Sequence, residues 1–109
     1  MELWQEIMDE QRLLDRAVRE LKPRGQARAQ AEHDYRMALS KRLLILRAEG
    51  NAVTHLADIA KGEPEIAELR LQRDIAESLY QSALESINVQ KLKIRILEGQ
   101  LNREWGNTK

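Results

Sequence analysis

The sequence contains no cysteine and no phenylalanine, and aromatic residues make up only 4% of its 109 residues. The lack of cysteine excludes a disulfide framework, a thiolate zinc site and a cysteine nucleophile, and it favours a reducing, intracellular setting. The scarcity of aromatics, beside 33% charged residues, excludes a rich globular core. Such a composition is typical of extended helices that bury their apolar residues along stripes.

Long apolar runs are missing as well. The longest run, Leu43 to Leu46, is far too short to span a membrane, and the acidic residues near the N-terminus exclude a secretory signal. We therefore expect a soluble, cytoplasmic protein with no membrane partner. Its length predicts that residues 1–109 form a single helical domain.

Neither sign of charge is in surplus, because 18 basic residues balance 18 acidic ones. The charges instead alternate in blocks, with a net charge of −3 over residues 1–21, +5 over 22–47, −5 over 48–88 and +3 over 89–109. A protein that binds polyanions normally carries one basic surplus. The alternating blocks therefore favour attraction between neighbouring helices of one bundle.

Apolar periodicity and turn residues predict an all-α fold, built from a helical hairpin and one long C-terminal helix. The expected helices cover about residues 3–21, 26–49, 54–61 and 64–104. We place a turn between the first two at Pro23 and Gly25, because proline disfavours helix in the residue before it and glycine tolerates left-handed geometry. Gly50 and Asn51 are expected to end the second helix.

The C-terminal helix carries the strongest pattern in the sequence. Alternating steps of three and four residues lead from Ile66 to Leu101 through eleven positions, of which nine are apolar or aromatic. Such a seam is typical of a coiled coil. Neither earlier helix is long enough to cover it, so we expect the part after about Ile87 to face a second copy in an oligomeric bundle. The predicted oligomer interface consists of Ile87, Ile94, Leu97 and Leu101.

Two polar residues, Arg73 and Gln90, interrupt this seam, where an unpaired polar group costs free energy. One interpretation is that they fix the register or the oligomeric state, as polar seam residues do in coiled coils. The other is that the bundle opens around them into a pocket, with Arg42 and Tyr80 adding donors. Such a pocket favours an anionic or nucleotide-like ligand, because guanidinium groups match phosphate geometry.

Other candidate sites are weaker. No Gly-rich phosphate loop, metalloprotease motif or nucleophile elbow occurs, so we expect no catalytic residue and no cofactor. His33 and His55 lack a second ligand at helical spacing, so no metal site is expected. The basic block at 22–47 offers nucleic acid only Tyr35 for stacking. Trp4 and Trp105, near the chain ends, are interpreted as interface anchors or as side chains packed on the nearest helix.

Three helical segments carry a resemblance to a known group of proteins: AEHDYR at 31–36, RDIAE at 73–77 and IRILE at 94–98. Over about residues 25–105 the chain resembles small, uncharacterised helical proteins encoded by phages and prophages of Gram-positive bacteria. The resemblance raises interest in Tyr35, Arg36 and Arg73 as binding residues, and it implies the cytoplasm of a bacterial host as the location.

This resemblance implies a non-catalytic phage accessory protein that binds and blocks or sequesters a host defence component, with a nucleotide-like signal as one candidate. The expected partners are further copies of the chain and a host protein or small anionic ligand. Two alternatives stay open. One is an accessory DNA-binding protein in phage replication or recombination, and the other is a structural coiled-coil scaffold.

Overall fold

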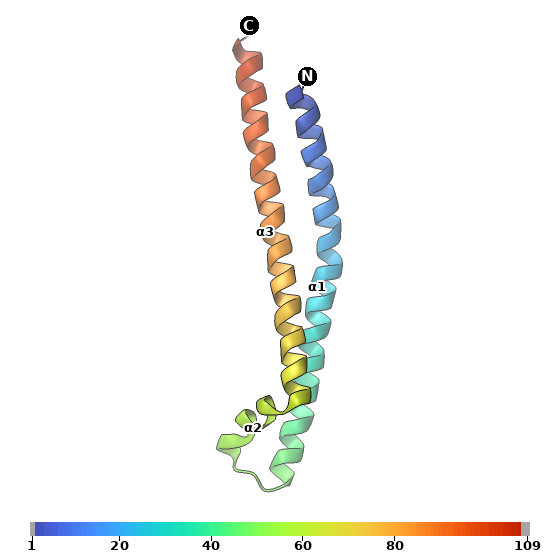
Figure 1. Cartoon of the computed structure of the whole chain (residues 1–109), viewed down its shortest axis with the longest axis vertical. Helices are drawn as coiled ribbons and strands as arrows, with labels where there is room; N and C mark the ends of the chain where they lie inside the picture. The colour runs from blue at the N-terminus through green and yellow to red at the C-terminus, as the bar shows by residue number, and fades with distance from the viewer. Residues whose placement is uncertain (1, 108–109) are drawn as a thin grey trace. The chain divides into compact units, whose positions relative to one another are not determined.

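The computed structural model describes residues 2–107, which form two long helices and a short helical connection (Figure 1). The elements are α1 (Glu2–Ala48), the 3-10 turn η1 (Val53–His55), α2 (Leu56–Gly62) and α3 (Pro64–Asn107). No strand occurs within residues 2–107, so the all-α prediction and the long C-terminal helix are confirmed. In the same residues, no helix carries an apolar stretch long enough to cross a bilayer.

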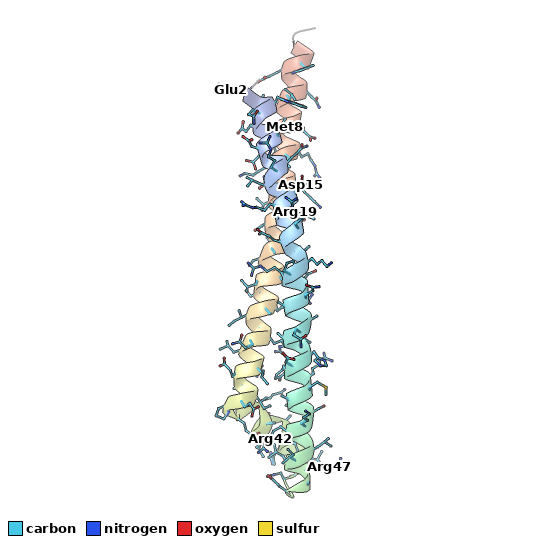
Figure 2. The ribbon with its side chains drawn as sticks, turned by 90° about the vertical axis from the view of Figure 1, so that its right-hand side faces the viewer. Glu2, Met8, Asp15, Arg19, Arg42 and Arg47 are labelled. Atoms are coloured by element: carbon cyan, nitrogen blue, oxygen red, sulfur yellow. The ribbon has the colours of Figure 1, made fainter. Side chains whose placement is uncertain are left out.

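The turn predicted at Pro23 and Gly25 is wrong, because α1 runs as one helix from Glu2 to Ala48 (Figure 2). Proline in a helix interior removes one backbone hydrogen bond and crowds the carbonyl four residues earlier. Here the ring lies on the exposed side of α1, whereas Leu21 and Gly25 are half-buried on either side of it. The helix therefore keeps its packed face and leaves the disturbed backbone in contact with water.

The predicted end of this helix is confirmed. Gly50 adopts a left-handed φ of 92°, which glycine reaches at no steric cost. The Gly50 N–H donates to the carbonyl of Arg47 at 3.1 Å, and the Asn51 N–H donates to that of Leu46 at 3.3 Å. The Asn51 side chain donates to the same Leu46 carbonyl at 2.9 Å. This is a Schellman motif, which satisfies carbonyl groups that the last helical turn leaves open.

The contacts of the described residues group into two compact units, and the sequence predicted one domain. Unit 1 comprises residues 2–23 and 80–107, and it pairs the first half of α1 with the second half of α3. Its two helices are antiparallel, because Leu3 and Trp4 share a recess with Leu101 while Glu10 contacts Gln90. Its buried apolar side chains are Ile7, Ile87 and Ile94.

Unit 2 comprises residues 24–79, in which the second half of α1 pairs with the first half of α3. These segments are also antiparallel, since Arg42 contacts Glu63 and Glu32 contacts Arg73. The core cluster is formed by Leu46 with two residues of α2, and partly buried leucines of α1 pack against it. The cluster consists of Leu46, Leu56 and Ala60, and the leucines packed against it are Leu39 and Leu43.

The prediction that the seam of α3 needs a second copy to cover it is wrong. Ile87 and Ile94 are only 6% and 7% exposed within a single chain. Leu97 and Leu101 are half-buried in the same unit. The error came from the turn placed at Pro23, which made α1 too short: the uninterrupted helix has 47 residues against the 44 of α3. These four residues therefore form the intrachain seam of unit 1.

The two prolines of the chain allow a matched test of the continuous helix. We expect Pro23→Ala to stabilise the protein by about 1–3 kcal/mol, because alanine restores the hydrogen bond and removes the clash. Pro64→Ala is the control, since Pro64 is the first residue of α3, where proline is well tolerated. Urea unfolding followed by circular dichroism measures both. An unchanged stability for Pro23→Ala would instead support a turn at this position.

The intrachain seam predicts a stability effect that does not depend on protein concentration. Ile94→Ala removes a buried side chain and is expected to cost about 2–4 kcal/mol. Leu13→Ala, at an exposed position of α1 in the same unit, should cost less than about 0.5 kcal/mol. The measurement is unfolding at two widely separated concentrations. If the Ile94→Ala effect grows with concentration, the side chain lies between copies rather than within one.

Candidate functional site

Arg73, the charged residue in the seam of α3, is held by three groups of unit 2. Its guanidinium carbon lies 4.5 Å from the centre of the Tyr35 ring, and Tyr35 itself is buried. A terminal nitrogen of Arg73 lies 2.9 Å from a carboxylate oxygen of Asp74, and its Nε lies 3.8 Å from Glu32. The hydrogen bond to Asp74 is the main cause that raises the pKa of Arg73. The cation is therefore neutralised by the chain itself.

Carboxylates also accompany the neighbouring arginines. Arg36 pairs with Glu32 one turn earlier on α1, and Arg28 pairs with Glu77 of α3. A shallow recess in unit 2 is lined by Gly25, Arg28, Ala29, Glu32, Arg36, Arg73 and Glu77. An anion that entered this recess would have to compete with the carboxylates that already bind its guanidinium groups.

Arg42 is engaged elsewhere in unit 2. Its Nε donates to Glu63, in the turn between α2 and α3, over 2.6 Å. This hydrogen bond raises the pKa of Arg42 and lowers the pKa of Glu63. The pair joins the end of the hairpin connection to α1 and does not extend the Arg73 cluster.

Gln90 belongs to unit 1 and faces Glu10 of α1. Its side-chain nitrogen donates to the Glu10 carboxylate and, over 3.2 Å, to the Glu10 backbone carbonyl. Lys93 approaches the same carboxylate at 4.0 Å. Glu10 interrupts an apolar stripe on the first half of α1, which consists of Leu3, Ile7, Leu14, Ala17 and Leu21. The polar interruptions of the two helices of this unit therefore lie opposite each other. Tyr80 is half-buried in the same unit.

The structure thus brings together three of the six predicted ligand residues, Tyr35, Arg36 and Arg73. Of the other three, Arg42 binds Glu63, and Gln90 and Tyr80 belong to unit 1. These contacts favour the first interpretation of the polar seam residues, in which they fix the register of the helix pairs.

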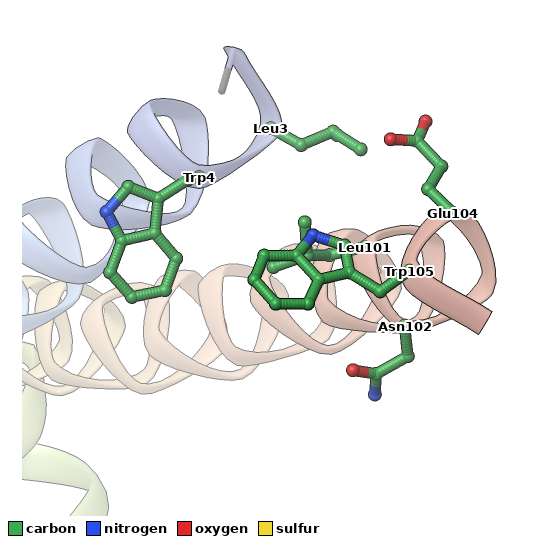
Figure 3. Close-up of a pocket in the computed structure, with 6 residues that line it drawn as sticks. All are labelled: Leu3, Trp4, Leu101, Asn102, Glu104 and Trp105. Atoms are coloured by element: carbon green, nitrogen blue, oxygen red, sulfur yellow. The ribbon is translucent and has the colours of Figure 1, made fainter. Parts of the chain in front are cut away.

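A different recess, at the end of unit 1 where both chain ends lie, gathers the two tryptophans (Figure 3). This tryptophan recess is lined by Leu3, Trp4, Leu101, Asn102, Glu104 and Trp105. The indole of Trp105 lies alongside Leu101, and Trp4 reaches toward the same space from α1 (Figure 3). Trp4 and Trp105 are 52% and 64% exposed, although large aromatic rings are normally well covered.

Three acidic side chains lie at or near the tryptophan recess, and Arg103 is the basic residue within two positions of Trp105. Glu104 lines it directly, and Glu2 and Glu6 are exposed within two residues of Trp4. The last turn of α3 contains no basic residue. An exposed aromatic surface beside carboxylates suits a ligand that is both apolar and cationic, since indole faces attract ammonium and guanidinium groups. The sequence pointed to both tryptophans but not to their proximity.

Residues 2–107 contain no group of three or more histidine, aspartate or glutamate side chains placed to hold a metal ion. Comparison with protein-family models finds no match, and neither do comparisons with curated proteins and with solved structures.

The Arg42–Glu63 pair predicts a pH-dependent contribution to stability. The pKa of Glu63 is lower in the folded chain than in the unfolded chain. The pair therefore contributes its full stabilisation above the unfolded pKa of Glu63, about 4.3, and loses it as the pH falls through the folded pKa. Glu63→Gln should therefore be less stable than the parent at pH 7, and the difference should vanish in acid. In an Arg42→Gln background, Glu63→Gln should have little effect at any pH, as unfolding experiments at several pH values can verify.

Proposed function

We propose that this protein is a non-catalytic binding protein that captures a segment of a partner protein in its tryptophan recess. The partner segment presents basic and apolar side chains. The observation that carries this proposal is the presence of two half-exposed indoles, from opposite ends of the chain, in one recess that Glu104 also lines.

Tryptophan supports this role for energetic reasons. It is among the residues most enriched at the positions that dominate binding energy in protein interfaces, because it buries a large rigid area on contact. A lysine or arginine side chain can lay its methylene stem on an indole and bring its charge to Glu104. The acidic Glu2 and Glu6 would attract such a segment from a distance.

The resemblance to phage proteins supplies the context of this proposal. A small binding protein of this kind would block a host protein. Of the two targets suggested by the sequence, a host protein and a nucleotide-like signal, we therefore keep the first. Binding of a nucleotide-like signal has less support, because carboxylates that would repel a phosphate lie beside Arg73 and line the tryptophan recess. The DNA-binding alternative also has less support, since Arg28, Arg36 and Arg42 are paired with acidic residues.

Tryptophan fluorescence tests the proposal directly, because the only two tryptophans of the chain line the recess. The probe is a short amphipathic peptide of leucine and lysine, and its counterpart is the same peptide with glutamate in place of lysine. We expect a saturable blue shift with the lysine peptide only. Trp4→Ala or Trp105→Ala should weaken binding at least about tenfold, and Glu104→Gln by several-fold.

Leu13→Ala is the matched control, because Leu13 is an exposed apolar residue of unit 1 outside the recess. Circular dichroism confirms that each variant remains helical. Equal binding of the lysine and glutamate peptides, or unchanged binding by both tryptophan variants, contradicts the proposed site.

A further inference from the structure

Unit 2 contains a further recess, lined by residues of α1, α2 and α3, which the proposed function does not use. The more buried part of its lining is apolar and consists of the Tyr35 ring, Leu39 and Leu43. Polar side chains from all three helices complete the lining. They are Glu32, Arg36 and Ser40 of α1, Lys61 of α2 and Arg73 of α3. We call this site the basic recess.

Tyr35 supplies a hydroxyl group to the basic recess. The residue is only 4% exposed, yet within residues 2–107 its hydroxyl makes no hydrogen bond with the chain. Among the same residues, no polar side-chain atom that is sealed from solvent lacks a partner. The Tyr35 hydroxyl therefore reaches the recess, where it can donate to a ligand.

Arg73 is fixed over the same tyrosine ring and keeps a donor free. Its guanidinium carbon lies 4.5 Å from the ring centre, and its Nε and one terminal nitrogen donate to Asp74 at 3.1 and 2.9 Å. The other terminal nitrogen, Nη1, has no hydrogen-bond partner in the described part of the chain. Arginine carries five N–H donors in a planar fork, so an acceptor can bind the remaining edge of this side chain.

Lys61 gives the basic recess a surplus of positive charge. Arg36 is paired with Glu32, and Arg73 is paired with Asp74. Lys61, by contrast, is exposed and forms no ion pair with any residue that the structure describes. Three cations against two carboxylates leave a net charge of +1.

The neighbouring recess at Gly25 has no such surplus. It shares Arg36 and Arg73 with the basic recess, but its third cation is Arg28, which is paired with Glu77. The basic recess is therefore the better place for an anion in unit 2.

One surplus charge beside an apolar surface suits a monoanion with an apolar body. A carboxylate can accept hydrogen bonds from the Tyr35 hydroxyl and from Arg73 while Lys61 balances its charge. An alkyl or aryl group attached to it can pack on the leucines of the lining, as ligands do in sites with a few placed polar groups. A phosphate carries nearly two charges at neutral pH, which would leave an excess of negative charge beside Glu32.

We propose that the basic recess binds a monocarboxylate with an apolar body, held by the Tyr35 hydroxyl, Arg73 and Lys61. Two sources share this chemistry, namely a small carboxylic acid and the C-terminal carboxylate of a peptide whose last residue is apolar. The basic recess belongs to unit 2 and the tryptophan recess to unit 1, so this inference does not rest on the proposed function.

Matched probes test the ligand class through chemical-shift changes of the backbone amides of the full chain. Hexanoate has the charge and the apolar body, whereas hexanol lacks the charge and acetate lacks the body. We expect saturable changes with hexanoate at amides of unit 2, and binding at least about tenfold weaker for hexanol and acetate. Hexyl phosphate should bind no more tightly than hexanoate.

A tripeptide that ends in leucine distinguishes the two sources. Its form with a free C-terminal carboxylate should bind, and its C-terminal amide should not. Tighter binding of the free peptide than of hexanoate assigns the site to a protein C-terminus, and the reverse order assigns it to a small acid.

Tyr35→Phe removes only the hydroxyl group and should weaken hexanoate binding several-fold. Its control is Tyr80→Phe, because Tyr80 is the other tyrosine of the chain and belongs to unit 1. Lys61→Gln should also weaken binding several-fold, whereas Lys41→Gln, an exposed position of unit 2 outside the recess, should not.

Thermal unfolding should show that Tyr35→Phe is as stable as the parent, since the hydroxyl has no partner in the described chain. Four results would each overturn the proposal: equal binding of hexanol and hexanoate, tighter binding of hexyl phosphate, shift changes confined to unit 1, or unchanged binding by both Tyr35→Phe and Lys61→Gln.

Discussion

The apolar seam of α3 has to be covered along its length, and the rest of the structure depends on how the chain does this. Only α1 is long enough, with 47 residues against 44, and it covers the seam only if it continues through Pro23. An interior proline costs about 3 kcal/mol relative to alanine. Burying each of Ile7, Ile87 and Ile94 in unit 1 contributes about 1.5–3 kcal/mol. Together these side chains outweigh the proline, so the helix continues.

Polar residues within the paired helices then decide the register. In unit 1, the gap at Glu10 meets the gap at Gln90, and in unit 2, Arg73 meets Glu32 and the Tyr35 ring. Such pairs contribute little net stability in their native place, because each group exchanges water for a protein partner. A helix that slipped by one heptad would leave these groups against apolar neighbours, at a cost of about 1–3 kcal/mol each. They therefore select one alignment of each antiparallel pair.

The sequence was most informative where structure is local. The seven-residue repeat predicted α3, and Gly50 predicted the end of α1. It failed at Pro23, because the local preference for a turn is overridden by packing between residues far apart in the chain. The candidate ligand site failed for a related reason. Arg28 and Arg42 look like free cations in sequence, but Glu77 and Glu63 reach them only once the hairpin forms.

Exposed apolar side chains occur on both long helices, and their order separates the two cases. On α1, apart from Trp4 in the tryptophan recess, the exposed large apolar residues are Leu13, Val18, Met37, Leu44 and Ile45. They form no continuous stripe, and scattered residues of this kind are ordinary on protein surfaces. On α3 they recur every three or four residues in each unit, as Leu71, Ile75 and Leu79 in unit 2 and as Val89, Leu92 and Ile96 in unit 1. Within each unit, the outer face of α3 is therefore a regular apolar stripe.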